Sequence, residues 1–123
     1  MGKKILVVDD EKKIVDLLYN FLSKEGFKVF TATDNESCLR IARQETPDLI
    51  VLDVMMPGIG GGDIAGNLQE YEKTKNIPVI FLTGAITEEE VAARGGKIAN
   101  RLFISKFSDI NEQISKIKKV LGI

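Results

Sequence analysis

The chain has 123 residues, of which 44% are hydrophobic and 28% charged, with a formal net charge of −1. This length predicts a single domain over residues 1–123, and the charge gives no general attraction to nucleic acid or an anionic membrane. One cysteine and no histidine exclude an internal disulfide and zinc or other soft-metal sites. No secretory leader or membrane-span pattern is recognisable, so we expect a cytoplasmic protein.

Strand-like and helix-like patterns alternate along the whole chain. Apolar residues between 14 and 22 recur at helical spacing, which predicts a helix with one buried face. We expect Asp10 to cap its start and Gly26 to end it. Strands are predicted at residues 5–8, 28–33, 48–53, 77–82 and 101–105. Further helices are predicted at residues 35–45, from residue 87 and from about residue 108, and one more follows the glycine-rich turn after the third strand and ends at about residue 73. This order predicts an α/β fold, a doubly wound (βα)₅ domain with a five-stranded parallel sheet.

Polar side chains follow four of the five predicted strands. Asp9 and Asp10 follow the first strand, Asp53 closes the third, Thr83 the fourth and Lys106 the fifth. Because ligands bind at the carboxyl ends of parallel strands, we expect these side chains to converge at one edge of the sheet. Three carboxylates there would repel one another unless a cation joined them, and oxygen ligands with open positions suit Mg²⁺.

Lys106 and Thr83 add a positive charge and a hydroxyl donor beside those carboxylates, a combination that can hold a phosphoryl group. A carboxylate can attack phosphorus and form an aspartyl phosphate. The chain has no Walker-type phosphate loop, so the phosphoryl group is expected to come from another molecule. Taken singly, Asp9 or Asp10 could also be a helix cap or a solvated surface residue.

The sequence resembles the receiver domains of two-component response regulators over its whole length. The matching stretches are Ile5 to Glu11, Pro47 to Gly58, Ile77 to Gly84, and Lys106. The resemblance implies a flavodoxin-like (CheY-like) sheet, and a histidine kinase or histidine phosphotransfer protein as phosphoryl donor. It implies Asp53 as phosphoacceptor, Asp10, Asp9 and the Met55 carbonyl as further Mg²⁺ ligands, Thr83 and Lys106 as phosphoryl ligands, and Phe103 as the aromatic switch residue.

The mechanism implied is a two-state switch with slow self-dephosphorylation. Thr83 would move toward the phosphoryl group, Phe103 would fill the vacated space, and a downstream protein would read the changed face. That face, made by the fourth helix, fifth strand and fifth helix, could also form a homodimer. Met55 and Ala85 offer no group that could orient an attacking water, so the phosphoprotein is expected to be long-lived.

Three departures from the family pattern keep other interpretations open. Phe107 replaces the usual proline after the lysine, glycines occupy 60–62, and residues 94–100 replace a short turn. One alternative is a pseudo-receiver, a binding module that works without phosphorylation. An aspartate-nucleophile hydrolase is disfavoured because Met55 stands where a second acid is needed, and a transcription factor because no helix-turn-helix pattern follows the last helix.

Overall fold

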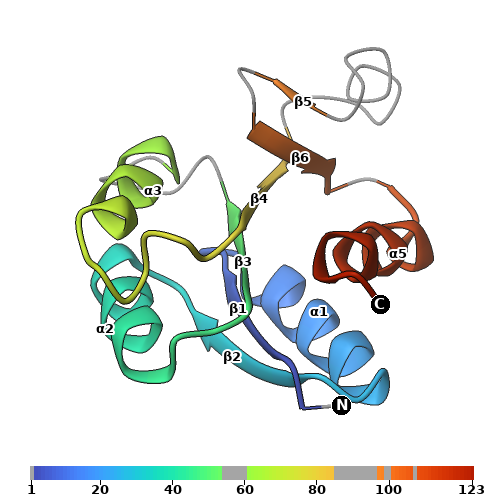
Figure 1. The fold of residues 1–123 in the computed structure, drawn as a ribbon. Coiled ribbons are helices and arrows are strands. Elements are labelled where there is room, and N and C mark those ends of the chain that lie inside the picture. The colour runs from blue at the N-terminus through green and yellow to red at the C-terminus, as the bar shows by residue number, and fades with distance from the viewer. Residues whose placement is uncertain (1, 54–60, 85–96, 99–100, 107) are drawn as a thin grey trace.

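A computed structural model describes residues 2–53, 61–84, 97–98, 101–106 and 108–123. One sheet runs through the molecule with helices on both of its faces (Figure 1). The strands are β1 (Lys4–Val8), β2 (Lys28–Ala32), β3 (Leu49–Asp53), β4 (Val79–Thr83), β5 (Lys97–Ile98) and β6 (Arg101–Ser105). The helices are α1 (Lys12–Lys24), α2 (Asn35–Glu45), α3 (Gly61–Gln69) and α5 (Ile110–Leu121).

The strand order is β2-β1-β3-β4-β6-β5, and the first five of these strands are parallel. This confirms the predicted doubly wound parallel sheet. The sequence did not predict β5, a two-residue strand that pairs antiparallel with β6 at the edge of the sheet. The chain winds from β1 outward to β2 and then crosses back to β3 on the other side of β1. The winding therefore reverses between β1 and β3, where parallel α/β sheets bind their ligands.

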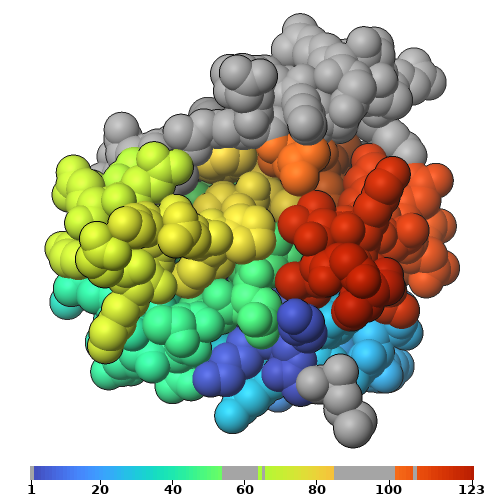
Figure 2. Space-filling view, in the orientation of Figure 1, coloured from blue at the N-terminus to red at the C-terminus, as the bar shows by residue number. Residues whose placement is uncertain are grey.

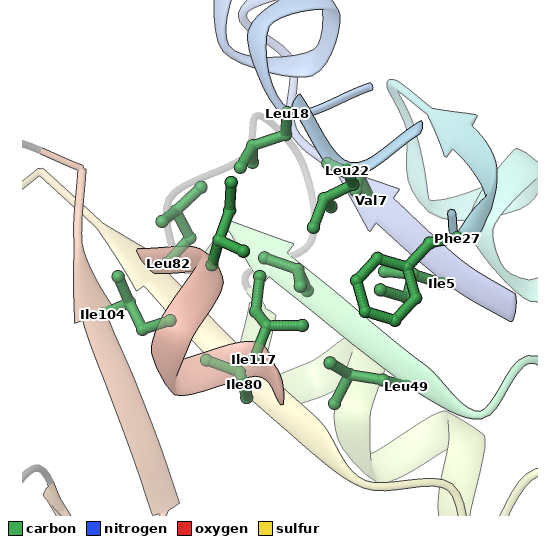
Figure 3. Close-up of a cluster of buried hydrophobic side chains, with 12 residues drawn as sticks. Ile5, Val7, Leu18, Leu22, Phe27, Leu49, Ile80, Leu82, Ile104 and Ile117 are labelled. Atoms are coloured by element: carbon green, nitrogen blue, oxygen red, sulfur yellow. The ribbon is translucent and has the colours of Figure 1, made fainter. Parts of the chain in front are cut away.

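The two faces of the sheet carry separate hydrophobic cores, because successive side chains of a strand point to opposite faces. On β1, Ile5 and Val7 belong to the core under α1 and α5, whereas Leu6 and Val8 belong to the core under α2 and α3. Figure 3 shows the first core, in which Leu18 and Leu22 of α1 meet Ile117 of α5 over the strands. Figure 1 shows α5 and α3 on opposite sides of the sheet, and in the space-filling view their red and yellow-green surfaces lie on opposite sides of the face shown (Figure 2). Each face of the sheet is thus covered by its own pair of helices.

The helix ends agree with the sequence in part. Gly26 follows the last turn of α1 with a positive φ of 92°, as predicted for a glycine that ends a helix. The expectation that Asp10 caps α1 is wrong: Glu11 is the N-cap residue, and its side chain makes no capping hydrogen bond. Instead, the Glu11 backbone N–H donates to Asp9 Oδ1 at 2.9 Å. Asp10 is therefore left exposed beside the start of the helix.

The helix predicted from Thr87 lies outside the described residues, as does Gly60 of the glycine run. The third predicted helix is shorter than expected, since α3 ends at Gln69 and turns occupy the residues up to about 76. Among the helices that the structure describes, none is long and apolar enough to cross a membrane.

Cys38 is fully buried in the core under α2. Burial, with a smaller contribution from the charge of Asp34, raises the pKa of the Cys38 thiol to about 12. The unfolded chain therefore loses this proton more easily than the folded protein. We expect the free energy of unfolding to fall above about pH 9 by up to about 1.4 kcal/mol per pH unit from this group. Urea unfolding of the wild type and Cys38→Ala at several pH values measures it, and parallel pH profiles would contradict the assignment.

Candidate functional site

Four of the residues singled out in the sequence lie at the carboxyl ends of neighbouring parallel strands. Asp9 follows β1, Asp53 is the last residue of β3, Thr83 is the last residue of β4, and Lys106 follows β6. The strand register aligns these ends, with Thr83 opposite Ser105 across β4 and β6. The Lys106 backbone N–H then donates to the Thr83 carbonyl oxygen at 2.8 Å, which extends this pairing by one residue. The predicted convergence at one edge of the sheet is confirmed.

Three carboxylates form an acidic cluster at this edge. Asp9, Asp10 and Asp53 each bring one oxygen to within 4.8 Å of the others. Asp9 and Asp53 are buried, at 0% and 1% exposed, whereas Asp10 is exposed. Asp9 Oδ2 is buried, and its contact among the described residues is an ion pair with Lys106, whose Nζ lies 2.9 Å away. Three carboxylates beside a single ammonium leave negative charge uncompensated, which fits a hard divalent cation such as Mg²⁺.

The ammonium group of Lys106 lies among these carboxylates. Its Nζ is 2.9 Å from Asp9 Oδ2, 3.3 Å from Asp53 Oδ2 and 3.0 Å from Glu11 Oε1. The Glu11 contact has hydrogen-bond geometry, whereas the contacts to Asp9 Oδ2 and Asp53 Oδ2 are ion pairs. The lysine side chain is 9% exposed, so little solvent screens the contacts with the two buried aspartates. Lys106 therefore partly neutralises the acidic cluster.

The protonation of Lys106 follows from two opposing effects. Burial alone lowers the pKa of the ammonium, because it disfavours the charged form. The contacts with Asp9 and Glu11, together with the charges of Asp9 and Asp53, outweigh burial and raise the pKa of Lys106 above its ordinary value. Lys106 is therefore a fixed positive charge at neutral pH, as a ligand for an anionic group requires.

Thr83 and Phe103 occupy the neighbouring part of the sheet. Thr83 is buried at the end of β4. Phe103, half-buried, lies directly opposite Phe81 on β4, and their rings stack with centroids 5.2 Å apart and an interplanar angle of 26°. Such aromatic pairs contribute about 0.5–1.5 kcal/mol beyond their burial. Met55, the predicted carbonyl ligand, and Phe107 lie outside the described residues.

Glu11 is a site residue that the sequence reasoning missed. It is part of the motif that starts at Ile5, but no role was assigned to it. Its carboxylate is 61% exposed and reaches Lys106 across 95 positions of the chain. The signal available was its place directly after Asp9 and Asp10, at the end of the same strand. That position did not reveal that Glu11 pairs with Lys106, because the two residues come together only when the chain folds.

Comparison with known proteins places this geometry in a family. The sequence model of the family described as "Response regulator receiver domain" matches residues 5–118 of the chain. The chain is 39% identical over 121 residues to the alkaline phosphatase synthesis transcriptional regulatory protein PhoP of Bacillus subtilis. The match includes 98% of this chain and 49% of that relative, so the chain spans about half the length of the curated relative.

Solved structures agree with this match. Chemotaxis protein CheY4 of Vibrio cholerae superimposes with a TM-score of 0.83 at 25% identity, over 98% of this chain and 99% of that chain. Response regulator TrrA of Thermotoga maritima, solved in complex with Mg²⁺–BeF, gives a TM-score of 0.76 at 34% identity, over 96% and 98% of the two chains. The chain therefore belongs to the response regulator receiver domains of two-component signalling, with a CheY-like fold.

Proposed function

We propose that this receiver accepts a phosphoryl group on Asp53 from a phosphohistidine of a histidine kinase or histidine phosphotransfer protein, in a Mg²⁺-dependent reaction. One observation carries the proposal. A buried carboxylate, Asp53, lies 3.3 Å from the Lys106 ammonium and within 4.8 Å of Asp9 and Asp10. An acid that served only to balance the lysine would not need two further carboxylates beside it. The surplus negative charge is suited to a cation.

The transfer is a substitution at phosphorus. An oxygen of Asp53 forms the new P–O bond as the P–N bond to the donor histidine breaks, and the departing imidazole nitrogen keeps the bonding electron pair. Lys106 needs no large movement to meet the product, because its Nζ already contacts Asp53 Oδ2 and can donate to a phosphoryl oxygen attached there. The Thr83 hydroxyl, at the end of the adjacent strand, is the proposed second donor. Catalysis is then mainly positioning and charge neutralisation.

Mg²⁺ would be held by Asp9, Asp10 and Asp53, with the Met55 carbonyl as a further proposed ligand. When bound, the ion neutralises negative charge on the carboxylates and on the transferred phosphoryl group. The chain's own part is to present the oxygens. Asp9 is fixed by the Glu11 N–H, which donates to Oδ1 at 2.9 Å, while Oδ2 lies 2.9 Å from Lys106 Nζ. Asp10 is exposed and can adjust to the ion.

The signal is proposed to leave through protein–protein contact near β6 and α5. Thr83 would turn toward the phosphoryl group, and the ring of Phe103 would then change its packing against Phe81. Because the two rings now stack, the switch must replace that contact with another of similar free energy. A downstream protein, or a second copy of the chain, would read the changed surface. The net charge of −1 still favours a protein partner over nucleic acid.

The proposal is tested by intact-mass measurement of the wild type after incubation with a small acyl phosphate, with and without Mg²⁺. We expect a gain of one phosphoryl group that requires Mg²⁺, because Lys106 alone neutralises only part of the acidic cluster. Ca²⁺ serves as the matched control ion, since it prefers a larger coordination shell.

Two other outcomes have distinct meanings. If the protein binds Mg²⁺ but gains no mass from either an acyl phosphate or a phosphohistidine donor, the phosphoacceptor proposal fails. If it neither binds Mg²⁺ nor gains mass, the pseudo-receiver interpretation is supported. A second mass increment would show that another group also accepts phosphate.

A further inference from the structure

We propose that Gln113 is a positioning residue for Lys106, acting through the turn between β6 and α5. This inference rests on the proposed function, because it concerns how the phosphoryl-binding lysine is held in place. The observation that carries it is a series of buried hydrogen bonds from α5 to Ser105, the last residue of β6. Lys106 is the residue that follows Ser105.

Gln113 is an amide on the inward side of α5, where the other buried residues are Ile114 and Ile117. It is only 5% exposed. A buried amide is costly unless its polar atoms find partners, and an apolar side chain of the same length could fill this space without that cost. The amide of Gln113 is therefore there to make a hydrogen bond: its Nε2 donates to the Ser108 carbonyl oxygen at 3.0 Å.

Ser108 passes this restraint on to the strand. It is 7% exposed, and its hydroxyl donates to the Ser105 carbonyl oxygen at 2.7 Å. The Ser108 backbone N–H donates to the same oxygen at 3.2 Å. The turn that leaves β6 is thus closed on the residue before Lys106 and fixed to α5 on the residue two after it.

Lys106 is held from the other side as well, because its N–H donates to the Thr83 carbonyl oxygen at 2.8 Å. The chain is therefore held to β4 at Lys106 and to α5 two residues later, at Ser108. This matters because lysine has a long, flexible stem, and its ammonium reaches Asp9 and Asp53 only if the base of the stem is fixed.

The sequence gives a reason for such an arrangement. Phe107 follows the lysine where the family usually has proline, whose ring would fix φ at that position. With phenylalanine at this position, the unfolded chain has more backbone conformations available than it would have with proline. The Gln113–Ser108–Ser105 hydrogen bonds supply a restraint of a different kind, from side chains.

The test compares Gln113→Met with Ile114→Val. Methionine keeps the length of glutamine but has no N–H donor, so the Ser108 carbonyl loses its partner. We expect the initial rate of phosphorylation by an acyl phosphate to fall at least tenfold, since small misplacements of catalytic groups have effects of about this size or larger. Mg²⁺ affinity, measured by titration, should not fall, because the carboxylates stand on other strands. Ile114→Val loosens the same helix core without touching the hydrogen bonds, and should keep the wild-type rate.

A purely structural role for Gln113 predicts a different pattern, in which rate and Mg²⁺ affinity fall together or neither changes. Either result in folded Gln113→Met would overturn the proposal. If that variant does not fold, Ser108→Ala removes only the hydroxyl bond to Ser105 and must show the same split between rate and affinity. If the wild type itself takes up no phosphate, the proposed function has failed rather than this inference.

Discussion

Asp53→Asn is expected to leave the protein folded and to abolish its Mg²⁺-dependent gain of a phosphoryl group. The amide has nearly the shape of the carboxylate but is not a nucleophile, so the P–O bond cannot form. We expect the rate of phosphorylation to fall by more than about 100-fold. Mg²⁺ affinity should fall as well, because one of the three clustered carboxylates is lost. Intact mass and a Mg²⁺ titration measure the two effects.

Asp48→Asn is the matched control for this substitution. Asp48 directly precedes β3, at the opposite end of the strand that Asp53 closes, is exposed, and accepts a hydrogen bond from the Lys4 N–H at 2.8 Å. An asparagine there can still accept that hydrogen bond, and the whole length of β3 separates it from the carboxylate cluster. Asp48→Asn should keep the wild-type rate and Mg²⁺ affinity. Phosphate uptake by folded Asp53→Asn, on Asp9 or Asp10, would show that the acceptor has been misassigned.

Lys106→Met is expected to slow phosphorylation by about 100-fold, because removing one charge-stabilising donor from a buried site has effects of this order. It should also destabilise the Mg²⁺-free protein by up to about 3 kcal/mol, since Asp9 and Asp53 lose their positive partner in a buried setting. Mg²⁺ should recover much of that loss, and should bind the variant at least as tightly as the wild type. Urea unfolding with and without Mg²⁺ measures the stability.

Lys75→Met is the control for the loss of a lysine charge. Lys75 pairs with Glu72 at 2.9 Å, but both side chains are exposed, and such surface pairs contribute less than about 1 kcal/mol. Its stability and rate should stay near those of the wild type. If Lys106→Met were phosphorylated at the wild-type rate, Lys106 would not be a phosphoryl ligand, whatever its effect on stability.

The two substitutions are expected to change Mg²⁺ affinity in different directions. Asp53→Asn weakens the metal site and removes the acceptor, so both the phosphorylation rate and the Mg²⁺ affinity fall. Lys106→Met removes a cation that competes for the same oxygens, so the rate falls while metal affinity holds or rises. The pair of variants therefore separates the acceptor from the phosphoryl ligand without a structure of the phosphorylated protein.

Much of the fold was available from the sequence, because its signals are local. Apolar runs marked the five parallel strands, and α2 was predicted with the bounds that the structure has. The strand β5 was not, since two residues carry no periodic pattern and its pairing with β6 is a contact between segments. The capping role expected of Asp10 was wrong by one position, because the chain at Asp9 turns to meet its own Glu11 N–H.

The sequence by itself determined which residues stand at the carboxyl edge, namely Asp9, Asp53, Thr83 and Lys106, because strand ends can be read from hydrophobic runs. Only the tertiary structure decided how they pair. The contact of Lys106 with Glu11 joins residues 95 positions apart. Likewise, nothing in the helical pattern of α5 distinguished Gln113 as a support for the lysine turn. Periodicity reports which face of an element is buried, whereas the partner of a polar side chain depends on the packing of distant elements.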